Sequence, residues 1–408
     1  MKNSQLFRIF GAIALALLFI VSCHKDVGSA SDEAQPLAEE ATLITYQGSQ
    51  VIPGGYIVVL KDAAGITDRA AGVNVYEKNK ATVREIAEEI LQSLRIETEK
   101  LGFVYGTALK GFSLTGLSEE EALALAAHPR VSYVEQDQTF SVSMGGPPGG
   151  GGGGGSSQTT PWGITRVGGA ANGVGKRAWI IDTGIDIDHP DLSVDVANGW
   201  SAWTSGPNAG PDDKNGHGTH VAGTVAAIDN TEGVIGVAAG ASVVPVKVLD
   251  RNGSGSNSGV IAGVDYVAAS ASGNDAANMS LGGGASTALD NAVIAASNAC
   301  PFALAAGNSS AHAGNYSPAR ANGPNIYTIA SMTSSDTWSS FSNFGQPPVD
   351  YIAPGSSVYS TYKDGGYATL SGTSMAAPHV CGILLLGNVN NGGTVTRVAG
   401  DVYTVSSR

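Results

Sequence analysis

The sequence predicts an α/β protein in which a parallel sheet is covered by helices on both faces and is preceded by a smaller α+β domain. The prediction rests first on six short apolar runs, each followed by a Gly-rich turn and a helical stretch. Continuous apolar strands that alternate with helices are typical of a parallel sheet buried on both sides. The runs are residues 178–181, 242–248, 278–281, 302–306, 325–331 and 349–353.

A shift in composition divides the chain into two kinds of domain. Residues 24–144 contain 28 charged residues in 121, whereas residues 145–408 contain 27 in 264. The 408 residues are enough for more than one domain with a buried core. The 56 glycines have no three-residue period, which excludes a collagen-like fibre, and the net charge of −13 argues against a nucleic-acid partner.

Residues 1–23 are predicted to be a signal peptide. Basic residues precede an uncharged run at residues 9–21, which at about 1.5 Å per residue is too short to span a bilayer core of about 30 Å. The segment ends at Cys23 in a pattern that resembles a bacterial lipobox, in which this cysteine would be lipidated. Ordinary cleavage near Ser22 is the alternative. Both interpretations predict export, as a cell-surface or outer-membrane lipoprotein or as a secreted extracellular protein, with membrane contact only through a lipid anchor.

Residues 24–53 are predicted to be a spacer, and residues 54–144 a domain that alternates strand and helix periods. Ser118 is expected to cap a helix with Glu121 at the third helical position, which is the pattern of a capping box. Strand, helix, strand, helix and strand in this order predict a small sandwich. The expected strands are 56–60, 103–114 and 131–135, and the expected first helix is 80–102.

Residues 145–157 form a glycine-rich linker that is expected to be exposed, flexible and open to proteases. Residues 158–408 then make up the second domain. Three cysteines are sparse for an exported protein, so no disulfide framework is expected. Cys300 and Cys381 have apolar neighbours, and they form either one pair or two buried free thiols.

Three segments of the second domain place a reactive residue directly after an apolar strand or at the start of a helix. Asp182 ends the run 178–181 and precedes a glycine turn. His217 stands between two glycines and opens a helix. Ser374 lies at a helix N-terminus, with Pro378 expected within the opening turn. In parallel sheets such residues collect at the carboxyl ends of the strands.

These residue types are the set that a serine nucleophile needs. A serine alkoxide is too basic to form unaided near neutral pH, so an imidazole must take its proton and a carboxylate must orient the imidazole. Taken singly, each residue would more often be a cap at the end of a strand or helix. Together they favour a catalytic triad of Asp182, His217 and Ser374. The order Asp, His, Ser is the one known for subtilisin.

With a fourth motif, AAGN at residues 305–308, the sequence resembles the subtilisin-like serine proteases. The resemblance implies that the Asn308 amide holds the oxyanion together with the backbone N–H of Ser374. It also implies that residues 54–144 are an inhibitory propeptide and that residues 158–408 hold the catalytic domain. The chain would then be a self-processing zymogen whose first cut falls near residues 143–145.

The end of the chain departs from the family pattern. The family's usual closing helix is hard to find in residues 387–408, which are polar and Gly-rich. Either the domain ends early with an atypical strand, or the chain is truncated.

The resemblance further implies two edge segments between which a peptide substrate lies as an added strand. The first pocket would be roomy and uncharged, which predicts a broad endopeptidase with an apolar or aromatic preference. The edge segments are Gly253, Ser254 and Gly255 on one side and Ser280, Leu281, Gly282 and Gly283 on the other. The pocket would be lined by Gly282, Gly283, Ala306 and Gly307.

A structural calcium site is also implied by the resemblance, because carboxylate, amide and carbonyl oxygens suit Ca²⁺. No catalytic cofactor is expected. The expected partners are protein and peptide substrates and the chain's own propeptide, and a monomer is expected. The implied calcium ligands are Gln158, Asp191, Ile228, Asn230, Glu232 and Val234.

Two other interpretations predict different features. A catalytically silent surface binding protein of the same fold would lack a triad member, and none is missing. A non-proteolytic serine hydrolase such as an esterase would carry a Gly-x-Ser-x-Gly elbow, which is absent around Ser374.

Overall fold

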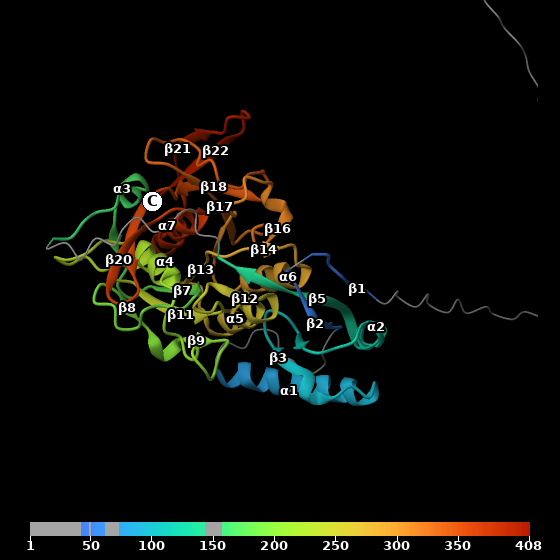
Figure 1. The fold of residues 1–408 in the computed structure, drawn as a ribbon. Helices are drawn as coiled ribbons and strands as arrows, with labels where there is room; N and C mark the ends of the chain where they lie inside the picture. The colour runs from blue at the N-terminus through green and yellow to red at the C-terminus, as the bar shows by residue number, and fades with distance from the viewer. Residues whose placement is uncertain (1–41, 49, 62–72, 143–156) are drawn as a thin grey trace, which may run out of the picture. The chain divides into compact units, whose positions relative to one another are not determined.

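The computed structural model describes residues 42–48, 50–61, 73–142 and 157–408, and the six apolar runs of the second domain all enter one ten-stranded sheet (Figure 1). Its strands are β7 (Arg177–Asp182), β8 (Ser193–Val194), β9 (Trp200–Ser201), β11 (Ser242–Lys247), β13 (Ala276–Met279), β15 (Phe302–Ala305), β17 (Ile326–Met332), β18 (Val349–Pro354), β21 (Asn390–Thr396) and β22 (Val402–Ser407). The order is β21-β22-β18-β17-β15-β13-β7-β11-β8, with β9 also paired to β11. Every pairing except β21 with β22 is parallel.

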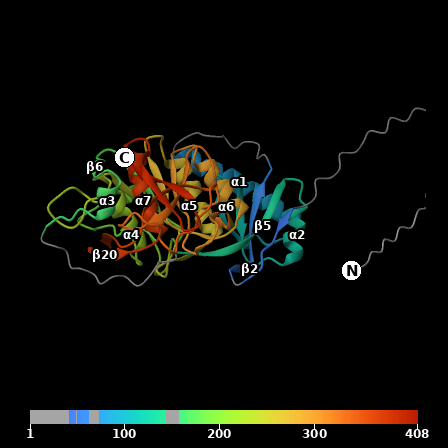
Figure 2. The same ribbon diagram turned by 90° about the horizontal axis from the view of Figure 1, so that it is seen from above.

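Helices cover both faces of this sheet, as predicted. Helices α4 (His217–Ala226) and α7 (Thr373–Leu386) lie together, as do α5 (Asn257–Ser270) and α6 (Thr287–Ala296), in Figures 1 and 2. Side chains alternate along a strand, so β7 serves both layers. Its Ala178 and Ile180 pack with α4 and α7, whereas Trp179 and Ile181 pack with α5 and α6.

The remaining elements of the second domain are short. They are α3 (Trp162–Arg166), η2 (Val196–Asn198), η3 (Ala313–Asn315) and the strand pairs β6 (Ala171–Asn172) with β10 (Ala238–Ala239), β14 (Gly283–Gly284) with β16 (Tyr316–Ser317), and β19 (Val358–Tyr362) with β20 (Gly366–Leu370). Cys300 and Cys381 are both free and buried, and they belong to cores on opposite faces of the sheet. Of the two alternatives for these cysteines, the structure has the free thiols.

Residues 387–408 form two strands instead of a closing helix. Strand β22 pairs parallel with β18 through Val405 and Ile352. Val395, Tyr403 and Val405 are buried in a core with Ile352 and Met332. The polar tail therefore extends the sheet.

The first domain is an α+β sandwich whose sheet has the order β1-β5-β2-β4-β3. Its elements are β1 (Leu43–Ile44), β2 (Val51–Leu60), α1 (Val73–Ser93), η1 (Thr98–Lys100), β3 (Leu101–Tyr105), β4 (Gly111–Leu114), α2 (Glu119–Ala126) and β5 (Val131–Ser141). Both helices pack on the strands in one core. The predicted capping box is confirmed, because Ser118 Oγ accepts from Glu121 N at 3.2 Å and Glu121 Oε2 accepts from Ser118 N at 2.7 Å.

Several predicted elements have the wrong bounds, and the strands expected at 56–60 and 131–135 are the longer β2 and β5. The helix expected at 80–102 ends at Ser93, because Arg95 adopts φ 59° and the chain turns there. The strand expected at 103–114 is a hairpin of β3 and β4. The strand expected at 278–281 is β13, which ends at Met279.

The described residues all belong to one compact unit, residues 40–408. No helix among them is long and apolar enough to cross a bilayer. Several predicted features lie outside the described residues. They are the signal peptide with Cys23, residues 24–41 of the spacer, residues 145–156 of the linker and the expected first cut at 143–145.

Candidate active site

The parallel register brings the three predicted catalytic segments to one edge of the sheet. Strands β7 and β13 end side by side, so Asp182 on one is the neighbour of Ser280 after the other. Helix α4 begins at His217 and packs against α7, which begins one residue before Ser374. All three segments thus meet at the carboxyl ends of the strands, where parallel sheets collect functional side chains.

Asp182 and His217 form a buried hydrogen-bonded pair. The Nδ1 atom of His217 lies 2.8 Å from Oδ1 of Asp182, and both side chains are 0% exposed. The same oxygen accepts from Thr183 N at 2.7 Å, which holds the carboxylate in place. Burial lowers the pKa of His217, but the charge and hydrogen bond of Asp182 and the charge of Asp213 outweigh it, so the net pKa is raised.

The glycines around His217 are required by close contacts. Gly216 has φ 106°, and a Cβ there would lie 2.4 Å from the ring of Tyr362. A Cβ on Gly218 would lie 2.1 Å from the carbonyl oxygen of Gly184. The chain can therefore carry the imidazole into this buried corner only with glycine on both sides.

Ser374 and Ser280 exchange two hydrogen bonds. The Ser374 hydroxyl donates to the Ser280 carbonyl at 3.1 Å, and the Ser280 hydroxyl donates to the Ser374 carbonyl at 2.8 Å. Pro378 was predicted to lie in the opening turn of α7, but it lies further along, inside the helix. It has no N–H to donate to the carbonyl four residues earlier, which is that of Ser374. The Ser280 hydroxyl supplies the missing donor, so the helix continues to Leu386.

The second link of the predicted triad, between His217 and Ser374, is not a hydrogen bond in this structure. The Ser374 hydroxyl points to the Ser280 carbonyl, and Nε2 of His217 has no hydrogen-bond partner among the described residues. Both residues are buried, with Ser374 4% exposed. The free ring nitrogen of His217 can thus accept a proton.

Asn308, the predicted oxyanion donor, is held by Thr373. Its Oδ1 atom accepts from Thr373 N at 2.9 Å and from Thr373 Oγ1 at 3.0 Å. Because two donors fix the oxygen, the amide orientation is set and Nδ2 remains as the donor. Asn308, Thr373 and Ser374 line one cavity of about 230 Å³.

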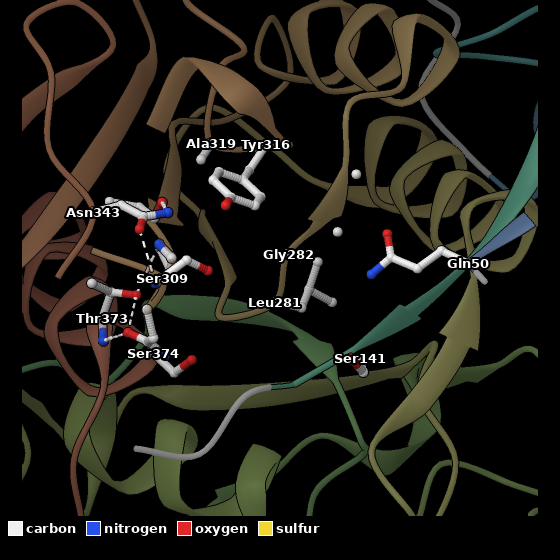
Figure 3. Close-up of a pocket in the computed structure, with 16 residues that line it drawn as sticks. Gln50, Ser141, Leu281, Gly282, Ser309, Tyr316, Ala319, Asn343, Thr373 and Ser374 are labelled. Carbon is white, nitrogen blue, oxygen red and sulfur yellow. Dashed lines mark hydrogen bonds between the residues drawn. The ribbon is translucent and has the colours of Figure 1, made fainter. Parts of the chain in front are cut away.

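Figure 3 shows Thr373 and Ser374 on one side of this cavity, Gln50 on the opposite side and Leu281 and Gly282 on the wall between them. None of the described residues that line it is charged. All four predicted pocket residues, Gly282, Gly283, Ala306 and Gly307, are among them, and Leu281 of the predicted edge segment lines the cavity as well.

The end of β5 lies between the two predicted edge segments. Strand β12 (Ser254–Ser256) pairs antiparallel with β5, with Gly255 opposite Phe140, and Val142 N donates to Gly253 O at 2.9 Å. On the other side Ser141 forms an antiparallel bridge with Gly282. The first domain thus inserts its last strand where an added strand would bind.

Comparison with known proteins identifies the family. The chain matches the family described as "Subtilase family" over residues 179–398 and "Peptidase inhibitor I9" over residues 55–143. The chain belongs to the subtilase family. It is 38% identical to "Extracellular serine proteinase" of Thermus sp. (strain Rt41A), over 92% of this chain and 88% of the relative. It is 44% identical to "Alkaline serine exoprotease A" of Vibrio alginolyticus, over 72% of this chain and 54% of the relative.

A solved structure described as a cold adapted subtilisin-like serine proteinase is 47% identical, with a TM-score of 0.49, and the match covers 55% of this chain and 83% of that chain. The two family matches show that this subtilase is a serine protease with an I9 propeptide, and with the helix-covered parallel sheet they confirm the predicted fold class.

The subtilase contains interface carboxylates that the sequence did not reveal. Glu135 of the propeptide accepts from Ser286 Oγ at 2.5 Å and from Ala288 N at 2.8 Å, so it caps the N-terminus of α6. Asp137 accepts from Ser258 Oγ at 2.6 Å and caps α5 in the same way. Carboxylates at helix N-termini are favoured by the helix dipole.

In the opposite direction, Asp265 of α5 binds the propeptide. Its carboxylate accepts from the N–H groups of Gly106, Thr107 and Ala108 at 2.7–2.9 Å in the β3–β4 turn. Burial raises the pKa of Asp265 to about 6, against the lowering effect of these N–H donors. No local sequence signal predicts this contact, because its partners are backbone groups of another domain.

Part of the predicted spacer also reaches the active site. Strand β1 pairs parallel with β5, Tyr46 N donates to Gln136 Oε1 at 3.0 Å, and Gln50 lines the cavity beside Ser374. Burial and the neighbouring Glu135 raise the pKa of the Tyr46 hydroxyl. These residues precede the I9 match, which begins at residue 55.

The residues implied as calcium ligands lie together around Asp191. Gln158 Nε2 donates to Ile228 O at 2.8 Å and faces Val234 O at 3.4 Å. Asp191 is 1% exposed and accepts from Asn230 Nδ2 at 2.8 Å and from Val234 N at 2.9 Å. Burial raises the pKa of Asp191. Among the described residues, no three His, Cys, Asp or Glu side chains are grouped so that they could hold a metal ion. A cation at this site would therefore depend on amide and carbonyl oxygens.

This donor set fits Ca²⁺. Turning the Gln158 amide by 180° would bring Oε1 beside the two carbonyl oxygens that Nε2 now faces. Oxygen ligands of mixed type around one buried carboxylate are what Ca²⁺ prefers. Glu232 is exposed, and its backbone N–H donates to Asn230 Oδ1 at 2.7 Å.

Proposed function

We propose that this subtilase is an endopeptidase in which Asp182, His217 and Ser374 catalyse acyl transfer and the Asn308 amide holds the oxyanion. The supporting observation is the buried Asp182–His217 pair, which lies at the same sheet edge as Ser374. Ser374 in turn lines the cavity that the end of β5 reaches between the two edge segments. Broad specificity with an apolar or aromatic preference is part of the proposal, because the residues that line the cavity are uncharged.

In the proposed mechanism the Ser374 hydroxyl turns from the Ser280 carbonyl toward Nε2 of His217 when a substrate binds. His217 takes the proton as Ser374 attacks the scissile carbonyl, and then gives it to the leaving amine. Asp182 remains ionised and keeps the proton of His217 on Nδ1. The N–H of Ser374 in the first turn of α7 and Asn308 Nδ2 donate to the oxyanion. Water then hydrolyses the acyl-enzyme.

A panel of chromogenic peptides tests this function. Peptides with Phe, Leu or Met before the scissile bond are expected to be cleaved with higher kcat/KM than those with Lys, Arg, Asp or Glu, because an uncharged pocket gives a charged side chain no partner. The Ser374→Ala variant is the control and should cleave none of them. Strict cleavage after Lys or Arg would contradict the proposed preference.

We also propose that the precursor processes itself. Ser141 bridges antiparallel to Gly282, two residues after Ser280, whose carbonyl accepts a hydrogen bond from the Ser374 hydroxyl. The first cut is expected at residues 143–145, which are the second to fourth residues after Ser141. The I9 domain supports the further proposal that the cut propeptide stays bound as an intramolecular inhibitor.

Export, with lipidation of Cys23, is proposed from the N-terminal sequence. The Thermus relative is named as an extracellular proteinase, which supports export. Membrane fractionation of wild-type and Cys23→Ser cells tests the anchor. Equal partition of both proteins into the soluble fraction would leave only the secreted alternative.

A structural Ca²⁺ held by Asp191, Gln158, Asn230, Glu232 and the carbonyls of Ile228 and Val234 is proposed as well. Gln158 N donates to Thr231 O at 2.9 Å, so an ion here would tie the start of the catalytic domain to the loop. Its role would be to stabilise the fold, and no catalytic step would pass through it.

Removing Ca²⁺ is expected to lower the Tm of the Ser374→Ala protein by about 5–10 °C, because a ligand at about 100 times its Kd stabilises by about 2.7 kcal/mol. Calorimetry with and without excess chelator measures the shift, and the inactive variant prevents self-digestion. Asp191→Ala is the control: its Tm should be low already and should not respond to chelator. An unchanged Tm in the parent protein would rule the site out.

A further inference from the structure

Beside the proposed triad lies a buried lysine that the mechanism does not use. Lys247 is the last residue of β11 and pairs in register with Asp182 on β7, so their side chains leave the sheet on the same face. Lys247 is 0% exposed. Its Nζ donates to Thr183 O and to Leu249 O, the latter at 2.9 Å, and lies 5.7 Å from the ring centroid of Trp203. These acceptors and the ring stabilise an ammonium charge.

A second buried carboxylate lies at the turn that precedes His217. Asp213 is 4% exposed and accepts four hydrogen bonds around the first turn of α4. Its Oδ1 accepts from Asn215 N and Gly216 N at 2.9 Å, and its Oδ2 accepts from Thr219 N at 3.0 Å and Thr219 Oγ1 at 2.7 Å. Four donors and a helix N-terminus stabilise its negative charge. The same bonds hold the turn that carries His217.

Other titratable groups packed around His217 add little charge. His220 on α4 and His379 on α7 are buried, and burial lowers their pKa to about 3 and about 4, so both are neutral. Burial likewise raises the pKa of Tyr362, which leaves it neutral. Asp212 is half-buried and pairs with Lys214, and Asp250 is half-buried in the turn after β11, where solvent partly screens its charge. The buried charges that remain are Asp182, Asp213 and Lys247.

We propose that Lys247 and Asp213 are positioning residues that balance the charge around His217 and thereby set how readily it takes the proton of Ser374. With His217 neutral, the two carboxylates and the ammonium leave one net negative charge. Protonation of His217 brings the buried site to zero. Without Lys247, the two carboxylates would stabilise the imidazolium too strongly to leave a free base at neutral pH. Without Asp213, the charge of Lys247 would offset that of Asp182, and the imidazolium would be stabilised too little.

The charges of these groups act on one another through the same interior. Burial lowers the pKa of Lys247, and Asp213 and Asp182 oppose that effect. Asp182 and Asp213 both raise the pKa of His217. Removing Lys247 should therefore raise the pKa of His217, and removing the charge of Asp213 should lower it. We expect each of these two changes to be roughly one pKa unit.

The test compares pH profiles of kcat/KM for mature wild-type enzyme, Lys247→Met, Asp213→Asn and the double variant, with an uncharged peptide substrate. The acidic midpoint reports the free-enzyme pKa of His217. We expect it to move up by roughly one pH unit in Lys247→Met, down by roughly one unit in Asp213→Asn, and back close to wild type in the double variant. Lys247→Arg keeps the charge and should keep the midpoint.

A purely structural role would lower the height of the profile or the Tm without moving the midpoints in opposite directions. Asp213→Asn loses the oxygen that accepts from Thr219 N and Oγ1, so a lower Tm is expected under either role. The two roles are separated by the midpoint of the pH profile. If Lys247→Met fails to fold, the Asp213→Asn and Lys247→Arg profiles still decide. The rate of fluorophosphonate labelling against pH gives the same midpoints without a peptide substrate.

This inference rests on the proposed triad, and the two can fail separately. If wild type hydrolyses no peptide, or if Ser374→Ala hydrolyses as fast as wild type, the proposed function is wrong. If wild type has an acidic midpoint that neither substitution moves by more than about 0.2 pH unit, or that both move in the same direction, the charge balance is wrong and the function stands.

Discussion

Replacing Ser374 by alanine is expected to lower kcat for peptide hydrolysis by about 10⁶-fold and to leave the chain uncut between its two domains. The size follows the loss of about 2 × 10⁶ known for removal of the subtilisin nucleophile. Ser374 lies at the end of the cleft that β5 enters, and its backbone N–H remains in the variant. The alanine protein should therefore fold and bind peptide but form no acyl-enzyme.

Mass spectrometry of the secreted wild-type and Ser374→Ala proteins measures the processing, and a chromogenic peptide measures the rate. Wild type should have a new end between residues 143 and 145, whereas the variant should retain the propeptide in one chain. Ser334→Ala, an exposed serine in a turn of the same domain, is the matched control and should process normally. A variant cut at the same bond as wild type would show that another protease makes the cut.

The triad segments could be predicted from the sequence because their signals are local. Asp182 follows an unbroken apolar run, and two glycines flank His217 where a side chain would collide with Tyr362 or Gly184. Such signals survive without knowledge of the rest of the chain. The register of β7 and β13, which makes Asp182 and Ser280 neighbours, needs the sheet order as well.

Features that depend on distant backbone groups could not be predicted. Pro378 was placed wrongly because its missing donor is replaced by the hydroxyl of Ser280, 94 residues from Ser374. Arg95 ends α1 with a positive φ, although arginine is not a residue type that signals such a turn. Lys247 was predicted only as part of the apolar run 242–248, because its acceptors are backbone carbonyl oxygens that no sequence pattern reveals.

Replacing Asp182 by asparagine is expected to lower kcat by about 10⁴-fold while the fold is kept. Oδ1 of Asp182 accepts from both Thr183 N and His217 Nδ1, so the asparagine oxygen should occupy that position and keep both bonds. The amide nitrogen then replaces Oδ2, which has no hydrogen-bond partner among the described residues. The variant thus loses the charge that stabilises the imidazolium, and it gains a buried donor that costs about 1–3 kcal/mol of stability.

The pH profile separates this loss of charge from a loss of structure. Asp182 raises the pKa of His217 by its charge and its hydrogen bond, so the acidic midpoint of kcat/KM should move to lower pH in Asp182→Asn as the rate falls. Asp186→Asn is the matched control. Asp186 is also buried, but it accepts from Gly365 N at 2.8 Å and is not part of the Asp182–His217 pair. Its rate should stay within about tenfold of wild type, because no charge is lost beside the imidazole. If Asp182→Asn behaved like this control, the buried pair would be a structural feature of the sheet edge, and His217 would draw its basicity from another group.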